Sequence, residues 1–142
     1  MKAILACAAI AAVAVGCVMA GGQETGALQP TEPRVAKVQN LMAGIQEPGM
    51  LLLQRSVRGA GPQSDDDWGA VTMNAALMNE IGFMLVQNER AKDAVWTKAA
   101  TDLRAASAAF HAASEKKDLA AMRAELPKLS ASCQECHTVH RK

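Results

Sequence analysis

Residues 118–141 read DLAAMRAELPKLSASCQECHTVHR and combine a helical repeat with a short cysteine motif. Apolar or sulfur-bearing residues recur every three or four positions, which places them on one face of a helix. Asp118 precedes the repeat and is expected to cap the helix, and Pro127 predicts either an early position in it or a kink. The repeat thus predicts a final helix with these residues on its core face: Leu119, Met122, Leu126, Leu129, Cys133, Cys136 and His140.

The motif itself is Cys133-Gln134-Glu135-Cys136-His137, a CxxCH pentapeptide. This pattern is the attachment signature of a c-type haem. The thiols of Cys133 and Cys136 add to the two vinyl groups of the porphyrin, and His137 binds the iron from one side as an axial ligand. The sequence therefore predicts one covalently bound haem c.

Two other readings of the cysteine pair are weaker. A thioredoxin-like redox pair needs a βαβ context, and no strand pattern surrounds Cys133. A structural zinc site needs four ligands, and after export only two cysteines would remain to combine with His111, His137 and His140. The remaining alternative is a haem-free helical bundle that acts as an interaction module.

Residues 1–20 are predicted to be a signal peptide. Lys2 is the only charge before Glu24, and residues 3–15 form an apolar run that is too short to span a bilayer. We expect cleavage after Ala20. In the alternative, residues 13–17 act as a lipobox, and Cys17 becomes a lipidated first residue that anchors the protein to a membrane. Both readings predict an exported, periplasmic protein.

The composition predicts one helical domain after the leader. Without Lys2 the chain carries 14 basic and 14 acidic residues, so no basic surplus suggests a nucleic-acid partner. Alanine is abundant in the second half, and runs of β-branched residues are absent. We expect a flexible segment at residues 21–30 and one four-helix domain at residues 31–142.

The first helix of this domain is predicted to begin at Thr31, as N-cap, with Pro33 in its first turn. Pro48 lies inside the pattern and predicts a kink or break near Glu47. Residues 59–62, Gly-Ala-Gly-Pro, end the segment. The inward stripe is predicted to comprise Val35, Val38, Met42, Ile45, Gly49 and Leu52.

Two further helices complete an antiparallel four-helix bundle with crossing angles near +20°. One is predicted at residues 68–88, after a capping box formed by Ser64 and Asp67. The other is predicted at residues 92–114. Their core stripes are Val71, Ala75, Met78, Gly82 and Leu85, widened by Met73, Leu77, Ile81 and Met84, and then Trp96, Ala99, Leu103, Ala106, Phe110 and Ala113.

With the motif on a last helix, the chain resembles the class II cytochromes c, the cytochrome c′ group. The likeness is specific in residues 118–124, in Ser132 with the motif, and in Arg141 four residues beyond the haem histidine. Trp96 with the two alanines at 99–100 is similar to the start of the family's third helix. The chain departs from the family pattern at Pro48, at His140, which replaces a common tyrosine, and in a short segment between Trp96 and Cys133.

The resemblance leaves two residues open for the side of the iron opposite His137. Counting from Arg34, the family register puts Val38 there, which implies an open or blocked site. Met42 is one turn further along and would give a six-coordinate, low-spin iron as a candidate sixth ligand. Arg141 is expected near the proximal histidine or a haem propionate.

These observations predict an exported electron carrier that works with redox partner proteins and is not an enzyme, because no catalytic acid, base or nucleophile stands out. The alternative is a five-coordinate protein that binds nitric oxide or carbon monoxide as a small gas ligand. Family members often dimerise through their first two helices, and the wide apolar face predicted for the second helix would allow a homodimer.

Overall fold

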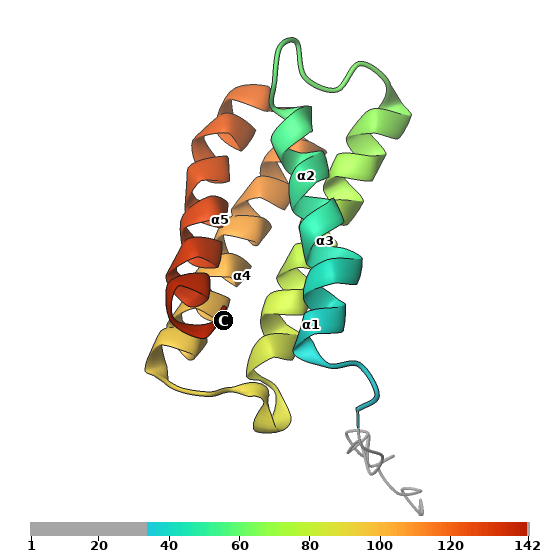
Figure 1. Cartoon of the computed structure of the whole chain (residues 1–142). Coiled ribbons are helices and arrows are strands. Elements are labelled where there is room, and N and C mark those ends of the chain that lie inside the picture. Colours follow the sequence, from blue (N-terminus) through green and yellow to red (C-terminus); the bar gives the residue numbers. More distant parts are fainter. Residues whose placement is uncertain (1–33, 142) are drawn as a thin grey trace, which may run out of the picture. The chain divides into compact units, whose positions relative to one another are not determined.

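The computed structural model describes residues 34–141, apart from the side chain of Asn88. The predicted signal peptide, the flexible segment, and Thr31 and Pro33 lie outside these residues. The described chain is an all-α four-helix bundle (Figure 1). Its elements are α1 (Val38–Leu41), the π-helical η1 (Met42–Gln46), α2 (Glu47–Ser56), α3 (Asp65–Val86), the short 3₁₀-helix η2 (Asn88–Arg90), α4 (Ala94–Glu115) and α5 (Leu119–His140).

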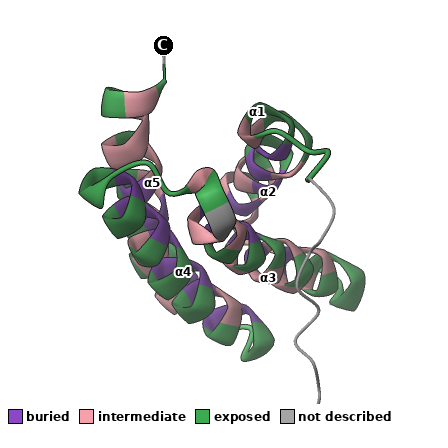
Figure 2. Cartoon of the chain, turned by 90° about the horizontal axis from the view of Figure 1, so that it is seen from below, coloured by how far each residue is buried: buried purple, intermediate pink, exposed green. Residues whose placement is uncertain are grey.

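The core forms because each helix turns one apolar face toward its neighbours (Figure 2). Extensive contacts join α3 to α4 and α4 to α5, while α2 packs on α3. The predicted stripes of α3 and α4 are confirmed, because all eleven of their first-named residues are buried. In α5 only Met122 and Leu129 of the predicted stripe are fully buried, and Cys133 and Cys136 are half-buried at the end that carries the motif.

The predicted helix caps at Ser64 and Asp118 are confirmed. Ser64 Oγ accepts a hydrogen bond from Asp67 N at 3.1 Å, and Asp67 Oδ2 accepts one from Ser64 N at 3.0 Å. Asp118 Oδ1 likewise accepts from Ala121 N at 2.9 Å. Asp93 caps α4, accepting from Trp96 N at 2.8 Å, so that helix begins slightly later than predicted. Pro127 lies inside an α5 that runs unbroken from Leu119 to His140.

The first helix differs from its prediction. Residues 34–37 are not helical, the first turn begins at Val38, and Val35 is 97% exposed. The predicted break near Glu47 takes the form of the π-helical turn η1, in which Glu47 N donates to Met42 O, five residues back. Of the predicted stripe, Gly49 is buried, and four residues are half-buried against the core: Val38, Met42, Ile45 and Leu52. The other buried residues are Leu41, Gln46 and Leu53, because a π turn holds more residues than an α turn and changes the register before α2.

The predicted widening of the apolar face of α3 is only partly correct. Ile81 is buried, but Met73 and Leu77 are exposed. The side of α3 that carries Met73 and Leu77 is not covered by α2 or α4. By length and apolar composition α3 could also cross a membrane, a test that the core helix of a bundle equally passes. A homodimer through this exposed side stays a prediction.

Two arginines tie the helices together near the ends of the bundle. Arg123 on α5 donates from Nε to Val57 O at 2.9 Å and from Nη2 to Gly59 O, which joins α5 to the end of α2. Arg90 donates to Ala36 O at 2.8 Å and so attaches the start of the first helix to the turn before α4. These contacts hold the first helix across from the end of α5 that carries the motif.

Candidate haem-binding site

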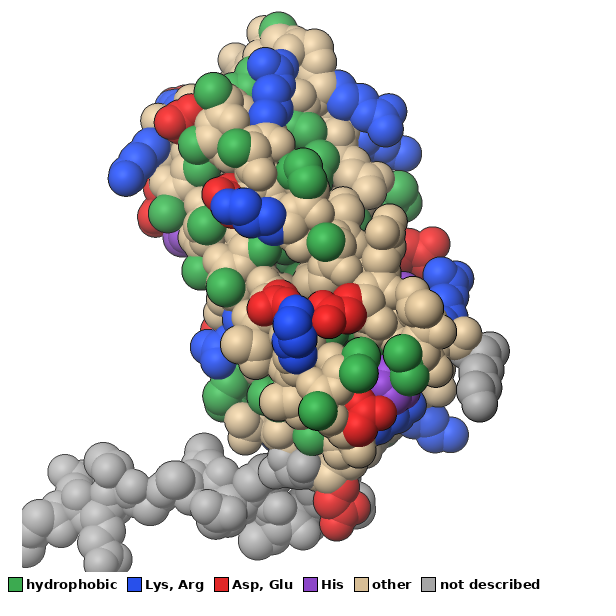
Figure 3. All heavy atoms as spheres, turned by 90° about the vertical axis from the view of Figure 1, so that its left-hand side faces the viewer, with side chains coloured by type: hydrophobic (Ala, Val, Ile, Leu, Met, Phe, Trp, Pro, Cys, Tyr) green, Lys and Arg blue, Asp and Glu red, His purple; other side chains and the backbone are tan. Residues whose placement is uncertain are grey.

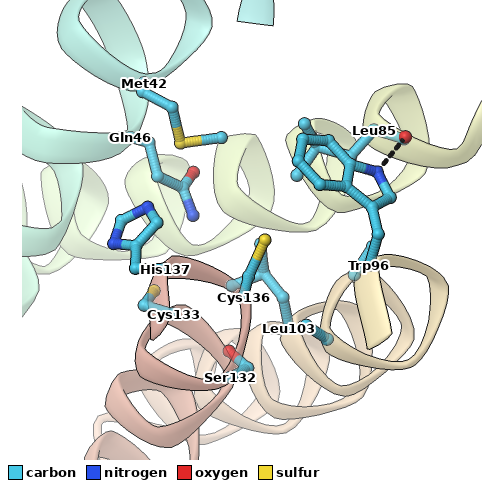
Figure 4. Close-up of a pocket in the computed structure, with 11 residues that line it drawn as sticks. Met42, Gln46, Leu85, Trp96, Leu103, Ser132, Cys133, Cys136 and His137 are labelled. Carbon is cyan, nitrogen blue, oxygen red and sulfur yellow. Dashed lines mark hydrogen bonds between the residues drawn. The ribbon is translucent and has the colours of Figure 1, made fainter. Parts of the chain in front are cut away.

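A pocket at one end of the bundle lies between η1 and the C-terminal half of α5, with α3 and α4 behind it (Figure 4). It brings together four residues that the sequence predicted and two that it did not place there: Met42, Cys133, Cys136 and His137, with Gln46 and Trp96.

The two cysteines are free and half-buried, three residues apart on α5. Burial raises the pKa of the Cys133 thiol, and its side-chain neighbours Ser132 and Gln46 partly offset that effect. Burial also raises the pKa of the Cys136 thiol, against the opposing charge of Lys92. Both side chains are therefore neutral thiols at neutral pH, side by side at one wall of the pocket.

His137 follows Cys136 directly and extends its ring toward Gln46 across the pocket (Figure 4). Burial lowers the pKa of the imidazole, and the positive charge of Arg141 lowers it further. An uncharged imidazole has a free nitrogen lone pair for a metal, so this environment favours a ligand. Arg141 is exposed and closes the helix, with its N donating to His137 O at 3.1 Å.

Gln46 was not predicted from the sequence as a residue of the site. Its side chain is 6% exposed, and its Oε1 atom is buried without a hydrogen-bond partner. A buried polar atom without a partner costs about 1–3 kcal/mol, so this oxygen marks a place where the protein provides polarity inside an apolar pocket. Gln46 lies three residues before Gly49 and seven before Leu53, on the same inward face of the helix, whereas the predicted stripe took the apolar Ile45 at this turn.

Trp96 forms a rigid wall of the pocket. Its Nε1 donates to Leu85 O at 2.7 Å, and the ring is 4% exposed. The ring of His140 meets it edge-on, with centroids 5.2 Å apart, and His140 Nε2 lies 3.3 Å from Asp93 Oδ1. His140 thus packs on Trp96 and lies beside Asp93, the N-cap of α4, and it does not line the pocket.

The other sequence candidates lie elsewhere. Val38, the other residue left open for the side of the iron opposite His137, does not line the pocket and packs against the core instead. His111 lies 3.5 Å from Glu115 on α4. Within residues 34–141 no three histidine, cysteine or acidic side chains converge as they would around a metal ion.

Beside the CxxCH motif, an ion pair joins α4 to α5. Lys98 on α4 lies between Asp102 and Glu135, with its Nζ 3.0 Å from Glu135 Oε2. Charges of both signs are interspersed on this side of the bundle (Figure 3). Solvent screens exposed pairs of this kind, so the pair mainly orients the Glu135 side chain of the CxxCH turn against α4.

The residues of the pocket fit a haem c in their chemistry. Two neutral thiols, an uncharged imidazole and largely apolar walls match the donors and the surroundings that this group needs. The cavity measures about 40 Å³, which suffices for a water molecule and not for a porphyrin. A porphyrin would therefore need η1 and α5 to lie further apart than they do here.

A helical bundle with CxxCH on its last helix has the arrangement of a class II c-type cytochrome. Comparison with protein-family models agrees, because the model described as cytochrome c′ matches residues 71–141, half of the chain. The chain belongs to the cytochrome c′ family, which implies a covalently bound haem c. Neither the curated proteins nor the solved structures contain a significant match to it.

Proposed function

We propose that this protein is an exported monohaem cytochrome that carries electrons. The observation that carries the proposal is that Met42 and His137, from opposite sides, line the same pocket as Cys133 and Cys136. Bound there, a haem supplies an iron that alternates between the ferric and ferrous states. In this proposal the two thiols hold the porphyrin covalently and His137 binds the iron.

The remaining pocket residues support an electron carrier through rigidity and exclusion of water. Trp96 is held by its hydrogen bond to Leu85 O, and Leu103 and Ala100 behind it are buried. Met42 offers a thioether, which as sixth ligand raises the reduction potential and closes the iron to gases. A site that changes little on electron transfer and is already six-coordinate suits a carrier rather than an enzyme.

Absorption spectra of the holoprotein test this proposal. We expect a low-spin ferric spectrum, reversible reduction, and no uptake of carbon monoxide by the reduced protein. Met42→Ala should convert the spectrum to high spin, while Met50→Ala, which removes a methionine that packs outside the pocket, should leave it unchanged. A haem that cannot be reversibly reduced would contradict the carrier function.

One observation favours the alternative of gas binding. Gln46 provides a buried amide inside the pocket, and its NH2 group is a donor for a hydrogen bond to a small gas ligand at an open iron. In that case the reduced protein would bind carbon monoxide readily, and Met42→Ala would not alter the spin state. Absence of covalent haem after expression with the attachment machinery would instead favour a haem-free interaction module.

Export is part of the proposal and rests on residues 1–20 of the sequence alone. The N-terminal residue of the mature protein tests it. A protein that begins at Gly21 would indicate ordinary cleavage and a free periplasmic carrier. A lipidated Cys17 would indicate an anchored one, and an uncleaved Met1 would contradict export by either route.

A further inference from the structure

Pro48 and the π-helical turn lie next to each other in the first helix. Pro48 is the second residue of α2 and directly follows η1, Met42–Gln46. In an unbroken α-helix its ring would collide with the carbonyl of Gly44, four residues back, and its nitrogen could not donate a hydrogen bond. A wider turn relieves that collision. The π turn therefore relieves the steric clash that Pro48 would cause in an unbroken α-helix.

The wider turn changes which residue precedes α2 on the pocket side. Because of the extra residue, Glu47 N donates to Met42 O. In an α-helix the same amide would donate to Ala43 O. The position one turn before Glu47 is thus filled by Met42 in this protein and would be filled by Ala43 without the π turn.

The position of α2 itself is set by its packing on α3. Leu53 is fully buried, and Gly49 approaches so closely that an added Cβ would lie 3.3 Å from Asn74 Oδ1 and 3.6 Å from Met78 Cε. Loss of the π turn would therefore rotate the residues before it and leave α2 in place. Met42 would move to the core position of Leu41, and Ala43 would face the pocket.

Building on the function proposed above, we propose that Pro48 is a positioning residue for the sixth iron ligand. It imposes the π turn, and that turn presents the thioether of Met42, in place of the methyl group of Ala43, to the side of the pocket opposite His137. The exposure of Ala43 and Gly44 and the half-burial of Met42 agree with this register. Figure 4 shows Met42 and Gln46 on the side of the pocket that faces His137.

Two variants of the holoprotein test the proposal. Pro48→Ala lets the helix close into a regular α-helix, and we expect loss of the near-infrared charge-transfer band of a methionine–ferric iron bond. Deletion of Ala43 in the Pro48→Ala background removes the extra residue and puts Met42 four residues before Glu47, one regular α-helical turn away, so it should restore the band. Pro62→Ala, in the connection between α2 and α3, is the matched control and should keep the wild-type spectrum.

A second measurement separates this inference from methionine ligation. The ¹³C-labelled methyl group of Met42 is shifted by the porphyrin ring current wherever it faces the haem, bound to iron or not. The chemical shift of this methyl group is measured in the reduced protein, and carbon monoxide is added if the iron is high-spin. Its signal is identified as the one that disappears in Met42→Leu. Pro48→Ala should abolish this shift and the deletion should restore it. A shift that persists in Pro48→Ala, or a deletion that fails to restore it, overturns the proposal.

The outcomes for the two proposals differ. A wild-type protein that lacks the charge-transfer band but shows the shifted methyl group would contradict ligation by Met42 and leave the register test intact. A wild-type protein without covalent haem would overturn both.

Discussion

Leu41 and Gln46 are five residues apart and both buried: Leu41 directly precedes the π-helical turn of the described first helix, and Gln46 is the last residue of that turn. In a regular α-helix the inward neighbours of Leu41 would be Gly44 and Ile45, three and four residues on. Here Gly44 is exposed and Ile45 is only half-buried. The buried side chain of Gln46 places an amide in the candidate haem pocket.

Gln46→Leu should stabilise the haem-free protein. The substitution removes a buried oxygen without a partner and replaces it with an apolar side chain of similar size, so we expect the free energy of unfolding to rise by about 1–2 kcal/mol. Urea denaturation measures it. Gln39→Leu, at an exposed position of α1, is the control and should change stability by less than about 0.5 kcal/mol. A clear loss of stability in Gln46→Leu would mean that the oxygen has a partner.

Two glycines of α3 should respond oppositely to alanine. A Cβ at Gly69 meets nothing within 4 Å, whereas one at Gly82 would lie 2.6 Å from Arg104 Cγ and 3.1 Å from Ala100 O. Gly69→Ala should stabilise the protein by about 0.5–1 kcal/mol through helix propensity. Gly82→Ala should destabilise it, since the backbone of α4 must move away. Thermal unfolding of the pair measures both, and equal effects would contradict the close approach of α3 and α4.

Arg123→Met should weaken the attachment of α5 to the end of α2. The guanidinium donates to Val57 O and Gly59 O, and its loss should cost about 1–2 kcal/mol of unfolding free energy. Arg123→Lys should recover only part, because an ammonium cannot reproduce the planar pair of donors. Lys128→Met, on the same helix with only a local pair to Glu125, is expected to have little effect. A similar loss in both methionine variants would point to a general charge effect.

The two motif thiols should alkylate slowly at neutral pH in haem-free protein. Burial raises both thiol pKa values above 9.0, and the thiolate is the reactive form. The rate should therefore keep rising about tenfold per pH unit beyond pH 9. An unfolded peptide with the same CQECH sequence is the control and should level off earlier. A plateau in the folded protein below pH 9 would contradict raised thiol pKa values.

Much of the bundle followed from the sequence because its helices obey local rules. The stripes of α3 and α4 and the caps at Ser64 and Asp118 depend on side chains within one or two turns of each other, and all were confirmed. The widened face of α3 was wrong at Met73 and Leu77, because burial there depends on whether another helix covers that side. The helical repeat alone contains no information about such a neighbour.

By itself the sequence determined the chemistry at the end of the chain and the class of fold. Two cysteines and a histidine within five residues lie together on any helix, so Cys133, Cys136 and His137 needed no tertiary information. Only the tertiary structure decided which residues of the first helix face them. The packing of Gly49 and Leu53 on α3 sets the position of α2, and the π turn before Pro48 adds one residue ahead of it. That single extra residue presents Met42 to the pocket, where Gln46 also lies, and Val38 is outside it.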